Sequence, residues 1–133
     1  MENEKLIIPK YITAEFLQEN PNIIFVFGDN LVRAGKGGAA RLRDEPNTYG
    51  FLTKKYPNNK DSSFFHPKEY KKIFYREFLF LIKKIKKNPE KTYIIPKLGS
   101  GLANRYFIYE KIIQPNLKKL KSLKNVIVLQ RYL

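Results

Sequence analysis

Short apolar runs alternate with longer amphipathic segments along the chain. The runs NIIFVF (22–27) and TYIIP (92–96) are continuous and rich in β-branched residues, a pattern typical of strands buried on both faces of a sheet. Three other short segments have a similar strand-like character. The predicted strands are residues 5–9, 22–27, 49–55, 92–96 and 125–133.

The helical signal is strongest at residues 67–87. Pro67 stands at the first turn, apolar side chains recur every three or four positions, and most lysines fall on the opposite face. The other predicted helices are residues 13–20 with Thr13 as N-cap, a segment that begins within 38–43, and residues 106–120 with a kink or break at Pro115. Strands that alternate with helices predict an α/β domain with a largely parallel or mixed sheet.

The composition is that of one globular domain. With 133 residues, of which 43% are hydrophobic, the chain is long enough to bury a core, and it shows no repeat or low-complexity linker. We therefore expect a single domain over residues 1–133. Because the chain has no cysteine and one histidine, we expect no disulfide, no cysteine nucleophile, no metal site and no cofactor.

The N-terminus gives no sign of export. MENEKLIIPK lacks an apolar stretch of signal-peptide length, and the longest apolar runs, IIFVF and FLFLI, are too short to span a bilayer. We expect a cytoplasmic protein without a membrane partner.

Basic residues outnumber acidic ones by a wide margin. The chain has 26 Lys and Arg against 12 Asp and Glu, and the formal charge of +14 attracts nucleic acids and other polyanions. Lysine supplies most of the excess, and the chain is also rich in Ile, Asn, Tyr and Phe. An AT-rich genome produces such a composition without selection for binding, so both explanations of the charge stay open.

Two glycine-rich loops follow the two buried strands. GDNLVRAGKGG comes after Phe27, and KLGSGLAN comes after Pro96. The carboxyl ends of the strands form the ligand crevice of an open α/β sheet, and glycine lets backbone amides approach an anion closely. Neither loop has Walker spacing or the GxGxxG fingerprint. The pair indicates a diphosphate site, with two tight turns as the structural alternative.

The segment YIIPKLGSGLANRYFIYEKIIQPNLKKLKSLKNVIVL, residues 93–129, resembles the end of macro domains, which bind ADP-ribose. The likeness is to the branch typified by the terminal ADP-ribose protein glycohydrolase, in which a strand leads into an IGxGL loop, a helix and a last V-x-V strand. In that branch TKK precedes the long helix, and FLTKK stands at 51–55 here. VFGDN…GKGGAARLRDEPNTYG is similar to the FGDN, GGAA and EPN pattern of small bacterial and phage macro-like proteins.

This resemblance implies a three-layer α/β/α macro-like fold with a mixed central sheet and a crevice for ADP-ribose or a related nucleotide. Asp29 and Asn30 would bond ribose hydroxyls, and the glycines would supply backbone amides to the diphosphate. The implied ligand-binding residues belong to the two loops: Gly28, Asp29, Asn30, Gly35, Gly37, Gly38, Gly99, Ser100, Gly101 and Leu102.

The resemblance also implies a catalytic lysine. Lys54 matches the residue that attacks the anomeric carbon of the ribose in the glycohydrolase. A lysine becomes a nucleophile when burial or neighbouring cations lower its pKa, and Lys55 is adjacent in sequence. The acid of that enzyme directly follows the GxGL loop, where this chain has Ala103. Asp29 is the candidate replacement acid or base; the alternatives are a surface Lys54 and a turn-forming Asp29.

Several residues near the loops have both a structural and a functional interpretation. Arg43 and Glu45 either end a helix or reach back to the ligand. His66 packs locally in its loop or touches the substrate, and Phe64 and Phe65 anchor that loop or stack on a base.

Three functions follow from these observations. The first is a binding module for ADP-ribose or a related nucleotide. The second is an enzyme that hydrolyses ADP-ribose from a modified macromolecule in the same crevice, with Lys54 and Asp29 as catalytic residues. The third is a basic nucleic-acid-binding protein whose crevice has no function.

Overall fold

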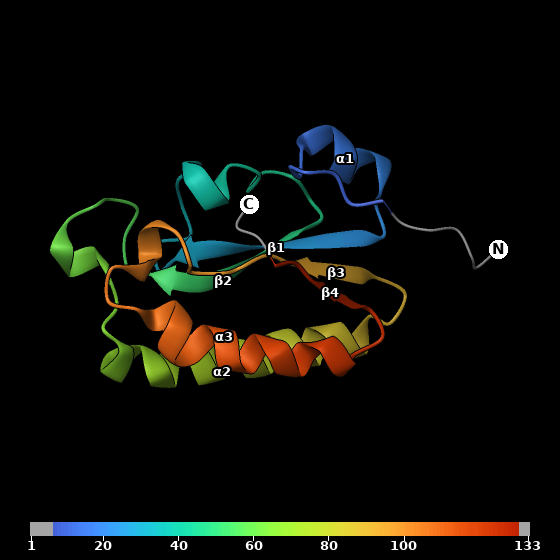
Figure 1. Ribbon diagram of the computed structural model, residues 1–133. Helices are drawn as coiled ribbons and strands as arrows, with labels where there is room; N and C mark the ends of the chain where they lie inside the picture. Colours follow the sequence, from blue (N-terminus) through green and yellow to red (C-terminus); the bar gives the residue numbers. More distant parts are fainter. Residues whose placement is uncertain (1–6, 131–133) are drawn as a thin grey trace.

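One parallel sheet forms the centre of the molecule. The computed structural model describes residues 7–130. Its strands are β1 (Ile23–Asn30), β2 (Thr48–Lys54), β3 (Thr92–Ile95) and β4 (Val126–Val128), in the order β2-β1-β3-β4 (Figure 1). All three strand pairs are parallel. The α/β class and the strands predicted at 22–27, 49–55 and 92–96 are confirmed.

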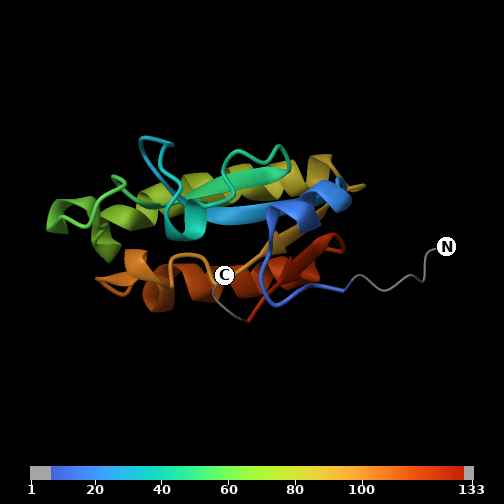
Figure 2. The ribbon, with the colours of Figure 1, turned by 90° about the horizontal axis from the view of Figure 1, so that it is seen from above.

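Helices cover both faces of this sheet. Helix α1 (Ala14–Glu19) lies on one face, and α2 (Pro67–Lys87) lies on the other, beside a C-terminal helical stretch that contains α3 (Gln114–Leu117) (Figures 1 and 2). The boundaries of α2 agree with the predicted helix at 67–87. The Thr13 side chain accepts a hydrogen bond from the Phe16 amide, which confirms it as the N-cap of α1.

The sheet separates two apolar clusters. Tyr70, Phe74, Phe78 and Leu81 of α2 pack against one face, while Phe25 and neighbouring residues of β1 pack under α1. β1 is buried along nearly its whole length because it has a strand on each side and helices above and below. This placement explains why its sequence is a continuous apolar run.

The exposed edge of β2 is blocked by side chains. The Arg33 guanidinium donates to the Gly50 carbonyl at 3.1 Å, and the Glu77 carboxylate of α2 accepts from the Leu52 amide at 2.9 Å. The two side chains also lie 3.7 Å apart. Backbone groups that would otherwise attract another strand are therefore occupied.

Several sequence predictions differ from the structure. Residues 7–9 of the predicted strand 5–9 form no strand, and residues 5 and 6 lie outside the described residues. The final strand, predicted at 125–133, has three residues, Val126–Val128. Residues 131–133 also lie outside the described residues. Because every described strand pair is parallel, the mixed sheet implied by the resemblance is not found in this part of the chain.

The remaining helices are less regular than the sequence predicts. The segment beginning at Gly38 ends after one 3-10 turn, Gly38–Ala40. The helix predicted at 106–120 begins later, as a π-helix at Tyr109–Ile113, and continues through α3 into the 3-10 turn Lys118–Ser122. Pro115 lies one residue after the change from π-helix to α-helix at Gln114, so the irregularity of this continuous helical stretch falls next to the residue where the sequence predicts a kink or break. Among the described helices, none has the length and apolar character needed to cross a membrane.

Candidate functional site

A pocket of about 460 Å³ lies at the carboxyl ends of β1 and β2. Both glycine-rich loops line it, the first with residues 28–30 and 34–40 and the second with Gly99, Gly101 and Leu102. β2 adds Thr53 and Lys54, and the turn after β2 adds residues 57–59. The structure therefore brings together two loops that lie some sixty residues apart in the sequence.

Thr53 joins the two loops at the base of the pocket. A Cβ on Gly28 would lie 2.9 Å from Thr53 Oγ1, and a Cβ on Gly99 would lie 3.5 Å from Thr53 Cγ2 and 2.6 Å from Ile113 Cδ1. Gly99 also has a φ of +77°. The close approach to Ile113 and the positive φ thus both disfavour a side chain at Gly99.

Several loop amides have no hydrogen-bond partner among the residues that the structure describes. The N–H groups of Gly35, Gly37, Gly99 and Gly101 donate no hydrogen bond to any acceptor in the described part of the chain. All four residues line the pocket. Unpaired amides on a concave surface can donate hydrogen bonds to water or to an anion.

The side chains of Asp29 and Asn30 hold the first loop in place. Asp29 is 4% exposed, and its carboxylate accepts hydrogen bonds from Arg43, Arg33 and the Asn30 amide. The Asn30 side chain donates to the Ala34 carbonyl at 2.8 Å and accepts from an amide of the same turn. Both side chains are occupied within the protein, and their predicted contacts to ribose remain a prediction.

Arg43 connects the carboxylate of Asp29 to the loop backbone. Its guanidinium also donates to the carbonyls of Gly35 at 2.7 Å and Ala34 at 3.2 Å. Glu45, the other candidate of this segment, accepts from Gln18 of α1 at 3.2 Å. Arg43 therefore holds Asp29 and the backbone of the first loop, both of which line the pocket. Glu45 instead contacts α1.

The second loop contributes mainly backbone. The Ser100 hydroxyl donates to the Lys97 carbonyl at 2.7 Å, so this side chain closes the turn. Leu102 is 67% exposed at the rim of the pocket. Ala103 lines the pocket next to it. Of the carboxylates that the structure describes, Asp29 alone is among the lining residues.

Lys54 is the ionisable amine of the pocket with a perturbed pKa. Partial burial, and then the positive charge of Arg105, hold the pKa of the Lys54 ammonium below its usual value. Its Nζ lies 3.4 Å from Asn59 Oδ1 and 5.0 Å from the centre of the Phe64 ring. Lys55, expected to lower this pKa, instead pairs with Glu69 at 2.8 Å.

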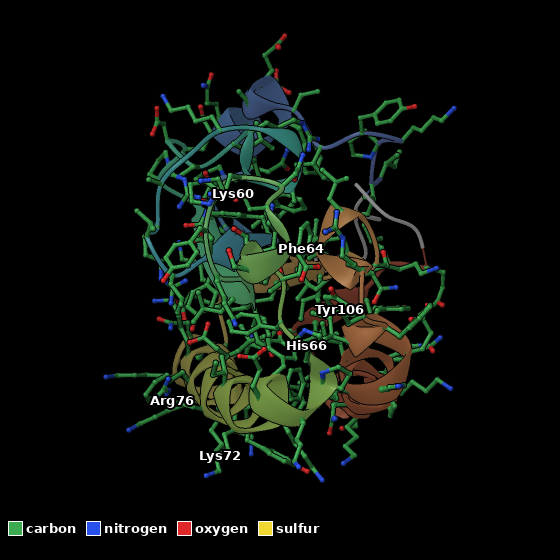
Figure 3. The ribbon with its side chains drawn as sticks, turned by 90° about the vertical axis from the view of Figure 1, so that its left-hand side faces the viewer. Lys60, Phe64, His66, Lys72, Arg76 and Tyr106 are labelled. Carbon is green, nitrogen blue, oxygen red and sulfur yellow. The ribbon has the colours of Figure 1, made fainter. Side chains whose placement is uncertain are left out.

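Phe64 and the residues around it lie beside Lys54 and are not among the residues that line the pocket. Phe64 is buried, and the Arg105 guanidinium lies 4.1 Å from its ring centre, so two cations contact one ring. His66, the N-cap of α2, stacks on Tyr106 with ring centres 3.9 Å apart (Figure 3). Asp61 accepts hydrogen bonds from Arg105 and Tyr106. These contacts fasten the turn after β2 to the segment that follows the second loop.

Sequence reasoning missed three residues of this site. Thr53 is hidden in the FLTKK segment, and its signal is its position at the carboxyl end of a predicted strand. Arg33 and Arg105 act across loops, 4 and 51 positions from the residues they influence. No local sequence pattern indicates which of 26 cations makes such contacts.

Residues 7–105 match a family model described as a family of unknown function, DUF7831. The chain belongs to this family. The matched range includes both glycine-rich loops, β2 and α2. No curated protein and no solved structure matches the chain. The description of the DUF7831 family assigns no activity to its members. The likeness to macro domains remains a prediction.

Proposed function

We propose that the pocket of this DUF7831 protein binds ADP-ribose or a related nucleotide. The observation that carries the proposal is the meeting of two glycine-rich loops across one pocket, each with backbone amides that have no partner within residues 7–130. A diphosphate needs several hydrogen-bond donors at close range, and glycine amides provide them without side chains in the way. A volume of about 460 Å³ lies within the usual range of ligand sites, roughly 300–1,000 Å³.

Charge in the pocket supports an anionic ligand. The carboxylate of Asp29 is neutralised by Arg43 and Arg33, so it offers little repulsion to a phosphate. Lys54, at the end of the neighbouring strand β2, adds a positive charge to the lining. The resemblance to macro domains, with helices on both faces of a central sheet, supports the same ligand, and we include the three-layer macro-like arrangement in the proposal.

Hydrolysis of an ADP-ribosylated macromolecule is the catalytic form of this proposal. The lowered pKa of Lys54 increases the fraction of neutral amine, which is the form that attacks a carbon. A general acid would come from Asp29, since position 103 is alanine. Two guanidinium groups hold that carboxylate, so Asp29 must release one of these contacts to reach a substrate.

Calorimetric titration tests the binding proposal. We expect ADP-ribose to bind to the wild type more tightly than AMP, because the second phosphate reaches the second loop. Gly37→Glu should abolish binding, since it places negative charge beside the phosphates. Gly37 has a φ of −86° and open space around its Cβ, so the variant should fold. Gly37→Gln is the matched control for bulk without charge. Equal affinity of wild type and Gly37→Glu would place the ligand elsewhere.

Turnover is tested separately with ADP-ribosylated protein and oligonucleotide substrates. Lys54→Ala should abolish release of ADP-ribose while retaining most of the affinity measured by calorimetry. Binding of ADP-ribose without turnover by the wild type would restrict the function to a binding module.

A further inference from the structure

The exposed side of α2 is rich in basic residues. Glu69 is the one acidic residue among the exposed positions of this helix, and it already pairs with Lys55. None of the exposed cations pairs with a carboxylate among residues 7–130. These cations are Lys68, Lys71, Lys72, Arg76, Lys83, Lys84, Lys86 and Lys87.

Apolar side chains interrupt this basic surface at its middle. Residues three or four apart share a helix face, so Lys72, Tyr75, Leu79 and Lys83 form one outward row. Tyr75 is 51% exposed and Leu79 is 65% exposed. Phe80, also more than half exposed, lies beside this row. In Figure 3, Lys72 and the neighbouring Arg76 extend from α2 away from the sheet.

The C-terminal helical stretch extends the charge. It lies on the same face of the sheet as α2 (Figures 1 and 2), and its exposed positions include Lys111, Lys118, Lys119 and Lys121. An extended polyanion could therefore contact cations along both helices. On α2, exposed aromatic rings lie among these cations.

We propose that the exposed face of α2 binds single-stranded nucleic acid. Lysines pair with the phosphates, and Tyr75 and Phe80 offer rings on which unpaired bases stack. A duplex has the same phosphates but keeps its bases stacked inside, so it gains nothing from the rings. A helix that lies in a membrane interface buries a broad apolar face. The broad apolar face of α2 packs on the sheet instead.

Fluorescence anisotropy with a labelled oligothymidine and a labelled oligouridine tests this surface. Tyr75→Ala should weaken binding at least fivefold and leave the salt dependence unchanged, because it removes stacking and no charge. Lys72→Gln with Arg76→Gln should reduce the slope of log K against log salt by about 1.4, since each lost phosphate contact on a single strand contributes about 0.7. All three side chains are exposed, so the variants should fold.

The chain offers a matched control on the opposite side of the sheet. Tyr11 is 61% exposed and Lys10 lies over its ring at 5.5 Å, near α1. Tyr11→Ala and Lys10→Gln should change the affinity less than twofold. Equal losses from the Tyr75 and Tyr11 variants would overturn the proposal, as would tighter binding of duplex or of phosphatidylserine vesicles at the same salt.

This inference does not depend on the nucleotide pocket. Excess ADP-ribose should leave the oligonucleotide bound, because the two surfaces are separate. Displacement by ADP-ribose together with an unchanged affinity of Tyr75→Ala would place the strand in the pocket and overturn the α2 assignment. Failure of ADP-ribose to bind at all would contradict the proposed function alone.

Discussion

The Arg43 guanidinium holds both oxygens of the Asp29 carboxylate, at 2.6 Å from Nη2 to Oδ1 and 3.1 Å from Nη1 to Oδ2. The same guanidinium donates to two carbonyls of the first glycine-rich loop. The Arg43 side chain thus fixes both the end of β1 and the shape of the loop. Bidentate pairing of this kind is available to arginine and not to lysine.

Arg43→Met should destabilise the protein by about 2 kcal/mol, because it leaves a buried carboxylate with one charged partner, Arg33, instead of two. Urea denaturation gives the free energy of unfolding. Arg33→Met is the matched control: its side chain is 46% exposed, and its pair is longer, at 3.3 Å, so we expect a loss of less than about 1 kcal/mol. Adding Asp29→Asn to Arg43→Met should recover part of the stability. A double variant no more stable than Arg43→Met would contradict this account.

Gly99→Ala should destabilise the protein and close the base of the pocket. The new Cβ would lie 2.6 Å from Ile113 Cδ1, on a backbone with φ of +77°, and we expect a loss of about 1–3 kcal/mol. Gly37→Ala is the comparison, since its Cβ meets nothing within 4 Å and its φ is −86°. Thermal unfolding of the two variants should differ clearly. Equal melting temperatures would show that Ile113 moves aside at no cost.

The regular elements and the pairing of the loops could be predicted from the sequence. The repeat of apolar residues in 67–87 is a local signal, and it gave the helix without reference to its neighbours. The two glycine-rich loops were expected at one edge of the sheet because both follow buried strands, and they do line one pocket. These predictions needed only periodicity and the geometry of parallel sheets.

The contacts between loops could not be predicted. Arg43 reaches Asp29 across 14 positions, and Arg105 influences Lys54 across 51. Such contacts depend on the path of each loop, which sequence periodicity does not contain. Asn47 is a further example: its side chain donates to carbonyls of Leu17 and Ile23, far from its own segment. A polar residue in a turn-rich segment gives no sign of such a partner.

Lys54 should react with an amine-acylating reagent at lower pH than other lysines do. Its pKa is lowered first by burial and then by Arg105, so a larger fraction of the amine is neutral at a given pH. Peptide mass spectrometry after brief labelling across a pH series gives the apparent pKa of each lysine. Arg105→Gln should shift the Lys54 profile part of the way to higher pH, while Arg76→Gln, on α2, should not. A Lys54 profile that matches that of exposed Lys60 would remove the basis for a nucleophilic role.

Tyr106→Phe should loosen the turn at residues 56–62, because the Tyr106 hydroxyl donates to the Asp61 carboxylate that fastens this turn. That hydrogen bond is the main reason that the pKa of Asp61 is lowered. A lowered carboxyl pKa stabilises the fold above the unfolded value, near pH 4, and this contribution is lost as the pH falls through the folded value. The variant should therefore show less acid dependence of its unfolding than the wild type.

At neutral pH we expect faster trypsin cleavage of Tyr106→Phe after Lys60. The control Tyr75→Phe, which removes a hydroxyl from the exposed side of α2, should be cleaved at the wild-type rate. Unchanged cleavage of Tyr106→Phe would mean that Arg105 alone holds Asp61.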